Sequence, residues 1–130
     1  MRPADERRAA EARGRRAEAA AALHLRLTRW RILERRARTS AGEIDLVACR
    51  GAILAFIEVK ARADMDEARE ALTPRQQQRL VRAGAVWRGR HERFCDHEIR
   101  FDLILVAPWR WPRRIPAAFM AEGADGLDLI

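Results

Sequence analysis

The sequence predicts a single α/β domain, a mixed β-sheet flanked by helices. Short runs of β-branched and aliphatic residues occupy 30–38, 44–59 and 99–105, whereas 11–28 and 73–89 have helical spacing or a helix-start signal. A chain of 130 residues is long enough for one domain with a modest core. We therefore expect a domain over residues 14–119, preceded by an extension and followed by a tail over 120–130.

The N-terminal residues predict one long or extended helix. Residues 1–13 are charged and alanine-rich, and we expect a flexible or helical extension there. In the helix that follows, Ala20, Leu23 and Leu27 form an i, i+3, i+7 stripe. We expect this stripe to cover one face of the sheet.

Residues 30–38 are expected to form a first strand, and 44–59 are expected to form a β-hairpin. The segment 49–52 supplies a glycine-containing turn between two apolar runs. Because side chains alternate along a strand, the hairpin should separate a polar face from a core face. The polar face should carry Glu43, Asp45, Glu58 and Lys60, and the core face should carry Ile44, Leu46, Ile57 and Val59.

The second half of the chain predicts one helix and two strands. Residues 63–72 are expected to form a loop beside the polar face, and Thr73-Pro74 then begins a helix that ends near residue 89. Residues 99–105 predict an interior strand, in which Arg100 and Asp102 are interpreted as a structural pair. The proline-broken segment 109–114 is expected to form an edge strand.

Lys60 is the one lysine among 26 lysine and arginine residues. An ammonium is a compact charge that can orient or deprotonate a water, whereas a guanidinium in practice never releases its proton. Carboxylates grouped with such a lysine suit a hard divalent cation, Mg²⁺ or Mn²⁺, and hence metal-assisted phosphodiester hydrolysis. The competing interpretation is that these residues form cross-strand ion pairs with no catalytic role.

The motifs Gly42-Glu43-Ile44-Asp45-Leu46 and Phe56-Ile57-Glu58-Val59-Lys60 resemble those of the YraN-like family. Weaker matches lie elsewhere in the chain: Gly14, Glu18, Arg38, Thr73-Pro74, Arg79-Leu80, Arg100-Phe101-Asp102 and Ala118-Phe119. This family is placed in the PD-(D/E)xK nuclease superfamily, near Holliday junction resolvases, which implies a restriction-endonuclease-like fold.

The resemblance also implies roles for individual residues. Asp45 and Glu58 would be metal ligands, Lys60 the catalytic lysine, and Glu18 a further acid and metal ligand. Glu43 matches the motif and is a further candidate catalytic residue, although the resemblance gives it no defined role. The chain departs from similar proteins at Gln76, where a lysine is common, and at Arg36, where an asparagine is common.

The charge of the chain indicates a polyanionic partner. The net charge is +7 and the isoelectric point is about 11.1, which favours nucleic acid as the partner. Single-stranded RNA, duplex DNA and branched DNA all fit this charge, and we expect DNA rather than RNA. The candidate phosphate-binding residues are Arg38, Arg62, Arg75 and Arg79. Trp87, Trp109 and Trp111 are interpreted either as base-stacking residues or as core residues.

No secretory signal or long apolar run indicates export or a membrane partner, and neither cysteine has a metal-ligand spacing, so we expect a cytoplasmic protein. Resolution of a junction would require two active sites and hence a homodimer, with which the sequence is compatible. The predicted function is metal-dependent cleavage of DNA, including branched DNA, or of RNA. The alternative is a non-catalytic nucleic-acid-binding or protein-interaction module.

Overall fold

The computed structural model describes residues 2–63 and 72–116. Its elements are α1 (Pro3–Leu27), β1 (Arg31–Thr39), β2 (Gly42–Arg50), β3 (Ile53–Ala61), α2 (Pro74–Gly89), the short 3-10 helix η2 (Glu92–Phe94), β4 (Glu98–Val106) and β5 (Arg113–Ile115). The five strands form one sheet in the order β1-β2-β3-β4-β5. Only the β3–β4 pair is parallel.

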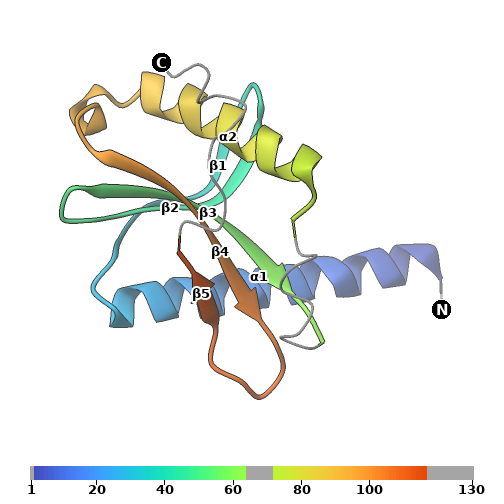
Figure 1. Cartoon of the computed structure of the whole chain (residues 1–130). Coiled ribbons are helices and arrows are strands. Elements are labelled where there is room, and N and C mark those ends of the chain that lie inside the picture. The colour runs from blue at the N-terminus through green and yellow to red at the C-terminus, as the bar shows by residue number, and fades with distance from the viewer. Residues whose placement is uncertain (1, 64–71, 117–130) are drawn as a thin grey trace.

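The two long helices lie on opposite faces of the sheet (Figure 1). This arrangement confirms the predicted α/β class, a mixed sheet flanked by helices in the restriction-endonuclease-like manner. Neither helix in the described ranges is long and apolar enough to cross a membrane. Most of the predicted loop 63–72, the predicted tail 120–130 and the weak match at 118–119 lie outside the described residues.

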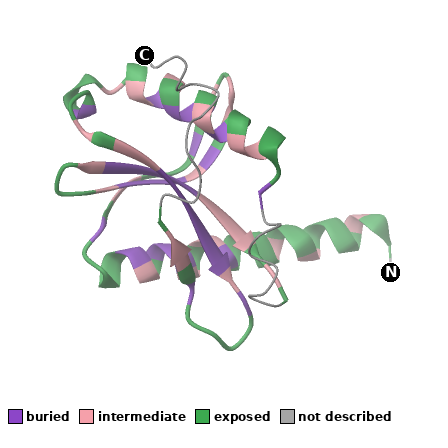
Figure 2. Cartoon of the chain, in the orientation of Figure 1, coloured by how far each residue is buried: buried purple, intermediate pink, exposed green. Residues whose placement is uncertain are grey.

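Helix α1 begins at Pro3, so the helical alternative for the N-terminal extension is the one observed. The predicted apolar stripe is wrong. Leu23 and Leu27 are exposed, and α1 instead contacts the sheet through buried Ala17, Ala21, Ala22 and Leu25. Small alanine side chains allow the helix to approach the strands closely, whereas the leucines lie on the flank. The first half of α1 is mostly exposed and projects beyond the sheet (Figure 2).

The predicted hairpin is confirmed, with β2 and β3 antiparallel around the turn at Gly51. Leu46 and Ile57 pack on the α1 side of the sheet, where Val59 also contacts the core. The prediction is wrong for Ile44, which is buried on the α2 side. The neighbouring strand β1 is irregular at Arg36, between the pairs Arg35–Leu46 and Ala37–Ile44, since Arg36 has a left-handed backbone with φ of 52°. Such a backbone departs from the regular extended strand, in which residues two apart share a face.

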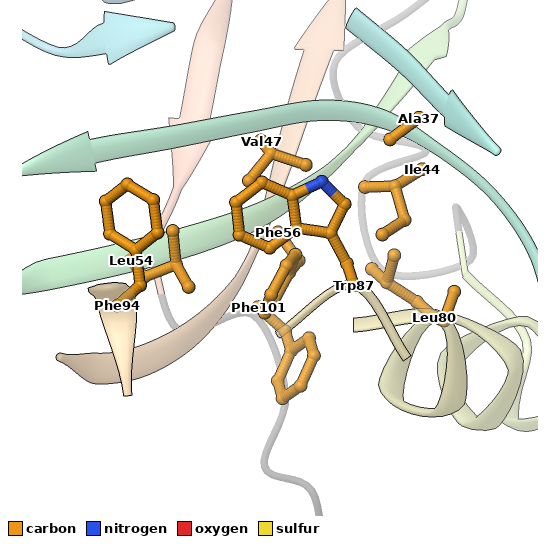
Figure 3. Close-up of a cluster of buried hydrophobic side chains, with 10 residues drawn as sticks. Ala37, Ile44, Val47, Leu54, Phe56, Leu80, Trp87, Phe94 and Phe101 are labelled. Carbon is orange, nitrogen blue, oxygen red and sulfur yellow. The ribbon is translucent and has the colours of Figure 1, made fainter. Parts of the chain in front are cut away.

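Helix α2 confirms the predicted start at Thr73-Pro74. The Thr73 hydroxyl accepts a hydrogen bond from the Gln76 backbone N–H, and the Gln76 side chain accepts one from the Thr73 N–H. Trp87 of α2 packs beside Phe56 and Phe94 (Figure 3). Thus Trp87 is a core residue and is not available for base stacking.

Strand β4 lies between β3 and β5, in the sheet interior as predicted. Asp102 is fully buried, and its carboxylate accepts hydrogen bonds from Arg100 and from Arg114 of β5. The interpretation of Arg100 and Asp102 as a structural pair is therefore confirmed. The predicted edge strand is confirmed only over Arg113–Ile115, because residues 109–112 form the connecting loop.

Candidate active site

Asp45 lies where strands β2 and β3 stop pairing. The pairing runs from Arg50 and Ile53 to Leu46 and Ile57, and Asp45 is the next residue of β2. Its Oδ2 atom accepts a hydrogen bond of 2.8 Å from the backbone N–H of Val59. The carboxylate therefore occupies the gap between the two strands and satisfies a donor that β2 leaves unpaired.

Glu58 and Lys60 stand on one face of β3, as the alternation of side chains predicts. The Lys60 ammonium nitrogen lies 3.2 Å from Glu58 Oε2, and the side chains are only 19% and 15% exposed. Strand β3 is paired with β4 beyond this point, which fixes the backbone that carries both residues. The site thus holds an oriented ammonium beside a carboxylate at low exposure.

Glu18 reaches the same region from α1. It lies one turn before Ala21 and Ala22 on the sheet-facing side of the helix, and its Oε1 accepts a 2.7 Å hydrogen bond from Arg36 Nε. Arg36 has a left-handed backbone, with φ of 52°. Asparagine, which the family resemblance implies for this position, tolerates that conformation better than most residues. Here the arginine instead tethers Glu18.

The carboxylates of the site influence one another. Burial, and after it the negative charges of Glu58 and Glu18, raise the pKa of Asp45 from its ordinary value of 3.8 to about 7. The Val59 N–H and the Lys60 ammonium oppose this rise. Three acids therefore share one partly buried region with two basic groups, Lys60 and Arg36.

Glu43 is not brought into this group. Its carboxylate is about half exposed and lies 3.8 Å from the guanidinium of Arg38, on the outer part of the β1–β2 hairpin. Within the described residues, no set of three or more Asp, Glu, His or Cys side chains has the spacing needed to hold one metal ion. The arrangement as it stands is a pair of strand acids with one lysine, and a third acid held nearby by an arginine.

The four predicted phosphate-binding arginines occupy three places. Arg38 is 91% exposed and lies at the β1–β2 turn. The side-chain carbons of Arg79 would lie 3.2 Å from a Cβ atom added at Gly42, so Arg79 also lies at this turn. Arg75 is exposed in the first turn of α2. Arg62 follows β3 directly and is held beside β4, where its backbone N–H donates to Val106.

Sequence reasoning overlooked two ion pairs that shape this protein. The Arg36–Glu18 pair joins β1 to α1, and the Arg114–Asp102 pair joins β5 to β4. Each links residues far apart in the chain or across a loop. An acid in a strand predicted to lie in the sheet interior, such as Asp102, requires partners when it is buried, and this signal could have indicated an arginine besides Arg100.

Comparison with known proteins gives consistent matches. Residues 17–106 match the "Uncharacterised protein family UPF0102". A protein of Methylocella silvestris named "UPF0102 protein" is 51% identical over 118 residues, which is 91% of this chain and 95% of the relative. A protein of the same name from Maricaulis maris is 49% identical over 95% of this chain and 97% of its own length.

Proposed function

The chain belongs to the uncharacterised protein family UPF0102, the YraN-like group of the PD-(D/E)xK superfamily, and from this premise we propose that it is a metal-dependent nuclease. The observation that carries the proposal is the meeting of Asp45, Glu58 and Lys60 at the gap between β2 and β3. The substrate would be DNA, including branched DNA, or RNA.

The chemistry of the donors fits a hard divalent cation. Magnesium takes oxygen ligands from one or two carboxylates and keeps waters and substrate phosphate in its other positions, so a set of three protein ligands is not required. The pKa of Asp45 is raised by burial and by the charges of Glu58 and Glu18, which indicates that negative charge is in excess there. A cation would relieve that excess.

Asp45 and Glu58 would hold the ion, Mg²⁺ or Mn²⁺. When bound, the metal supplies positive charge against the scissile phosphate and lowers the pKa of a water. Lys60 would orient or deprotonate the attacking water, and its pairing with Glu58 limits the positions that its ammonium adopts. Glu18 would add a third carboxylate from α1, at a position set by Arg36.

The arginines that flank the site would bind the substrate backbone. Arg38 and Arg79 lie together at the β1–β2 turn, and Arg75 is exposed at the start of α2. Each phosphate contact releases counterions, so affinity should fall steeply with salt.

The decisive experiment is cleavage of labelled single-stranded, duplex, flap and four-way-junction DNA, and of RNA, with Mg²⁺, Mn²⁺ or EDTA. Asp45→Asn and Lys60→Ala should each reduce cleavage by roughly a hundredfold or more, the scale of losing a positioned catalytic group. Glu43→Gln is the matched control, since this acid lies on the same strand but pairs outward. It should keep near-normal activity.

A second readout separates metal binding from cutting. Mg²⁺ at about ten times its Kd should stabilise the wild type against unfolding by about 1.4 kcal/mol and leave Asp45→Asn unaffected. Equal cleavage by wild type and Asp45→Asn would mean that a contaminating nuclease is responsible, and would refute the proposal.

A non-catalytic nucleic-acid-binding module is the second candidate. It is favoured by one observation, that Glu58 and Glu18 already have ion-pair partners in the protein itself. This candidate predicts salt-sensitive binding without cutting under any metal, and binding by Asp45→Asn that is equal to or tighter than that of the wild type.

A further inference from the structure

The loop between β4 and β5, residues 107–112, exposes two tryptophans. Trp109 is 101% exposed and Trp111 is 72% exposed. By contrast, the chain's other tryptophans, Trp30 and Trp87, are buried in the core. Indole rings are large and largely apolar, so high exposure of two in one loop indicates a surface that a partner covers. We refer to residues 107–112 as the tryptophan loop.

The tryptophan loop is anchored at both ends. Strand β5 pairs with β4 through Leu103–Ile115 and Leu105–Arg113, and Arg114 reaches the fully buried Asp102 at 3.1 Å. Trp109 has a left-handed backbone, with φ of 61°, which a bulky residue rarely adopts and which costs about 1–3 kcal/mol. Side-chain packing does not offset this free-energy cost, because the Trp109 ring is exposed.

The tryptophan loop lies at the end of the sheet that carries the candidate active site. Strand β4 runs parallel to β3, with Leu105 opposite Lys60 and Val106 opposite Ala61, and the loop begins at the next residue (Figure 1). Paired strands are about 4.8 Å apart and each residue extends at most about 3.4 Å. Trp109 is therefore at most roughly 15 Å from Lys60, a distance that a few stacked nucleotides span.

The positive charge of this segment indicates the chemical class of its partner. Residues 107–116 carry three arginines and no acid; Arg114 is paired with Asp102, whereas Arg110 and Arg113 are exposed. Cations next to exposed aromatic rings are the combination with which proteins bind unpaired bases, because the rings stack on bases while the cations contact phosphates. In an intact duplex the base faces are already stacked on one another, so this combination favours a single-stranded segment.

We propose that Trp109 and Trp111 stack on unpaired bases of the nucleic acid strand whose phosphate is cleaved at Lys60. This inference rests on the proposed function and narrows its substrate to nucleic acids with single-stranded segments, such as flaps and single-stranded tails. Both tryptophans act in binding and not in the chemical step.

The test measures binding in EDTA, so that it does not depend on cleavage. Labelled single strands of DNA and RNA and a blunt DNA duplex, each about 20 nucleotides long, are titrated with the full chain and followed by fluorescence anisotropy. Trp109→Ala and Trp111→Ala should each weaken single-strand binding about tenfold and duplex binding less than about twofold. Leu27→Ala is the control, an exposed apolar residue on α1.

Paired substitutions distinguish stacking from simple apolar contact. Trp109→Phe retains an aromatic face and should keep most of the single-strand affinity, whereas Trp109→Leu keeps apolar surface alone and should bind like Trp109→Ala. Single-strand binding by Trp109→Leu equal to that of the wild type would overturn the inference, because apolar contact would then be sufficient without stacking. Tryptophan-dependent binding to phosphatidylserine vesicles, without selective loss of single-strand binding, would also overturn it.

The outcomes separate this inference from the proposed function. Suppose that the alanine variants selectively lose single-strand binding but the wild type cuts nothing with any metal. This result would support base stacking by the tryptophan loop and refute the proposed nuclease activity. Metal-dependent cleavage together with unchanged single-strand binding in both alanine variants would support the proposed nuclease activity and refute base stacking by the tryptophan loop.

Discussion

Replacing Asp45 with asparagine should make the metal-free protein more stable near neutral pH while removing its metal site. The folded protein holds the Asp45 proton more tightly than the unfolded chain, because burial and the charge of Glu58 raise the pKa of this carboxyl from 3.8 to about 7. The stability that Asp45 contributes is therefore fully present below about pH 4 and is lost as the pH rises through about 7. Asparagine carries no charge to bury at any pH.

The size of the effect follows from the same shift. A rise from 3.8 to about 7 corresponds to roughly 4 kcal/mol at 1.36 kcal/mol for each pKa unit. Because Asp45 is only partly buried, water screens its charge, and we expect about 1–2 kcal/mol. The asparagine Oδ1 atom can still accept the hydrogen bond from Val59. For a chain of 130 residues, this predicts a Tm higher by about 4–8 °C.

The assay is thermal unfolding in EDTA, followed by circular dichroism, at about pH 8 and about pH 4.5. Asp45→Asn should raise the Tm at the higher pH and change it little at the lower pH. Glu43→Gln is the control, since this half-exposed acid pairs with Arg38 and should alter stability by less than about 0.5 kcal/mol. A lower Tm for Asp45→Asn at pH 8, or an equal gain at both pH values, would refute the reasoning.

Three further predictions concern the scaffold that positions the site. Asp102→Ala should lower the free energy of unfolding by about 3–5 kcal/mol in urea titrations, because Arg100 and Arg114 would lose their buried partner; a loss below about 1 kcal/mol would contradict this. Gly84→Ala should cost about 1–3 kcal/mol, since the added methyl would lie 2.9 Å from the Phe56 ring; Gly89→Ala, with no atom within 4 Å, is the control and should be neutral or stabilising. Thr73→Ala should cost about 1 kcal/mol and Thr73→Ser much less, because only the hydroxyl caps α2; equal losses would show that the capping bond is unimportant.

Local patterns in the sequence were sufficient for the order of the elements and for part of the site. The alternation of side chains placed Glu58 and Lys60 together, because the two-residue period of a strand is a property of the backbone. The Thr73-Pro74 start of α2 was equally local. The motif around Asp45, Glu58 and Lys60 also predicted the family, which the relatives confirm.

Tertiary structure decided the rest, because it depends on contacts between distant residues. The sequence showed neither that Leu23 and Leu27 would be exposed nor that alanines would carry α1 onto the sheet, since both choices fit a helical period. The charge of Glu18 acts on Asp45 only because α1 packs against the sheet, and Glu43 lies outside the site, where it pairs with Arg38 of β1. The sequence by itself determined which side chains could do chemistry, and the packing of α1 and β1 against the hairpin decided which of them meet.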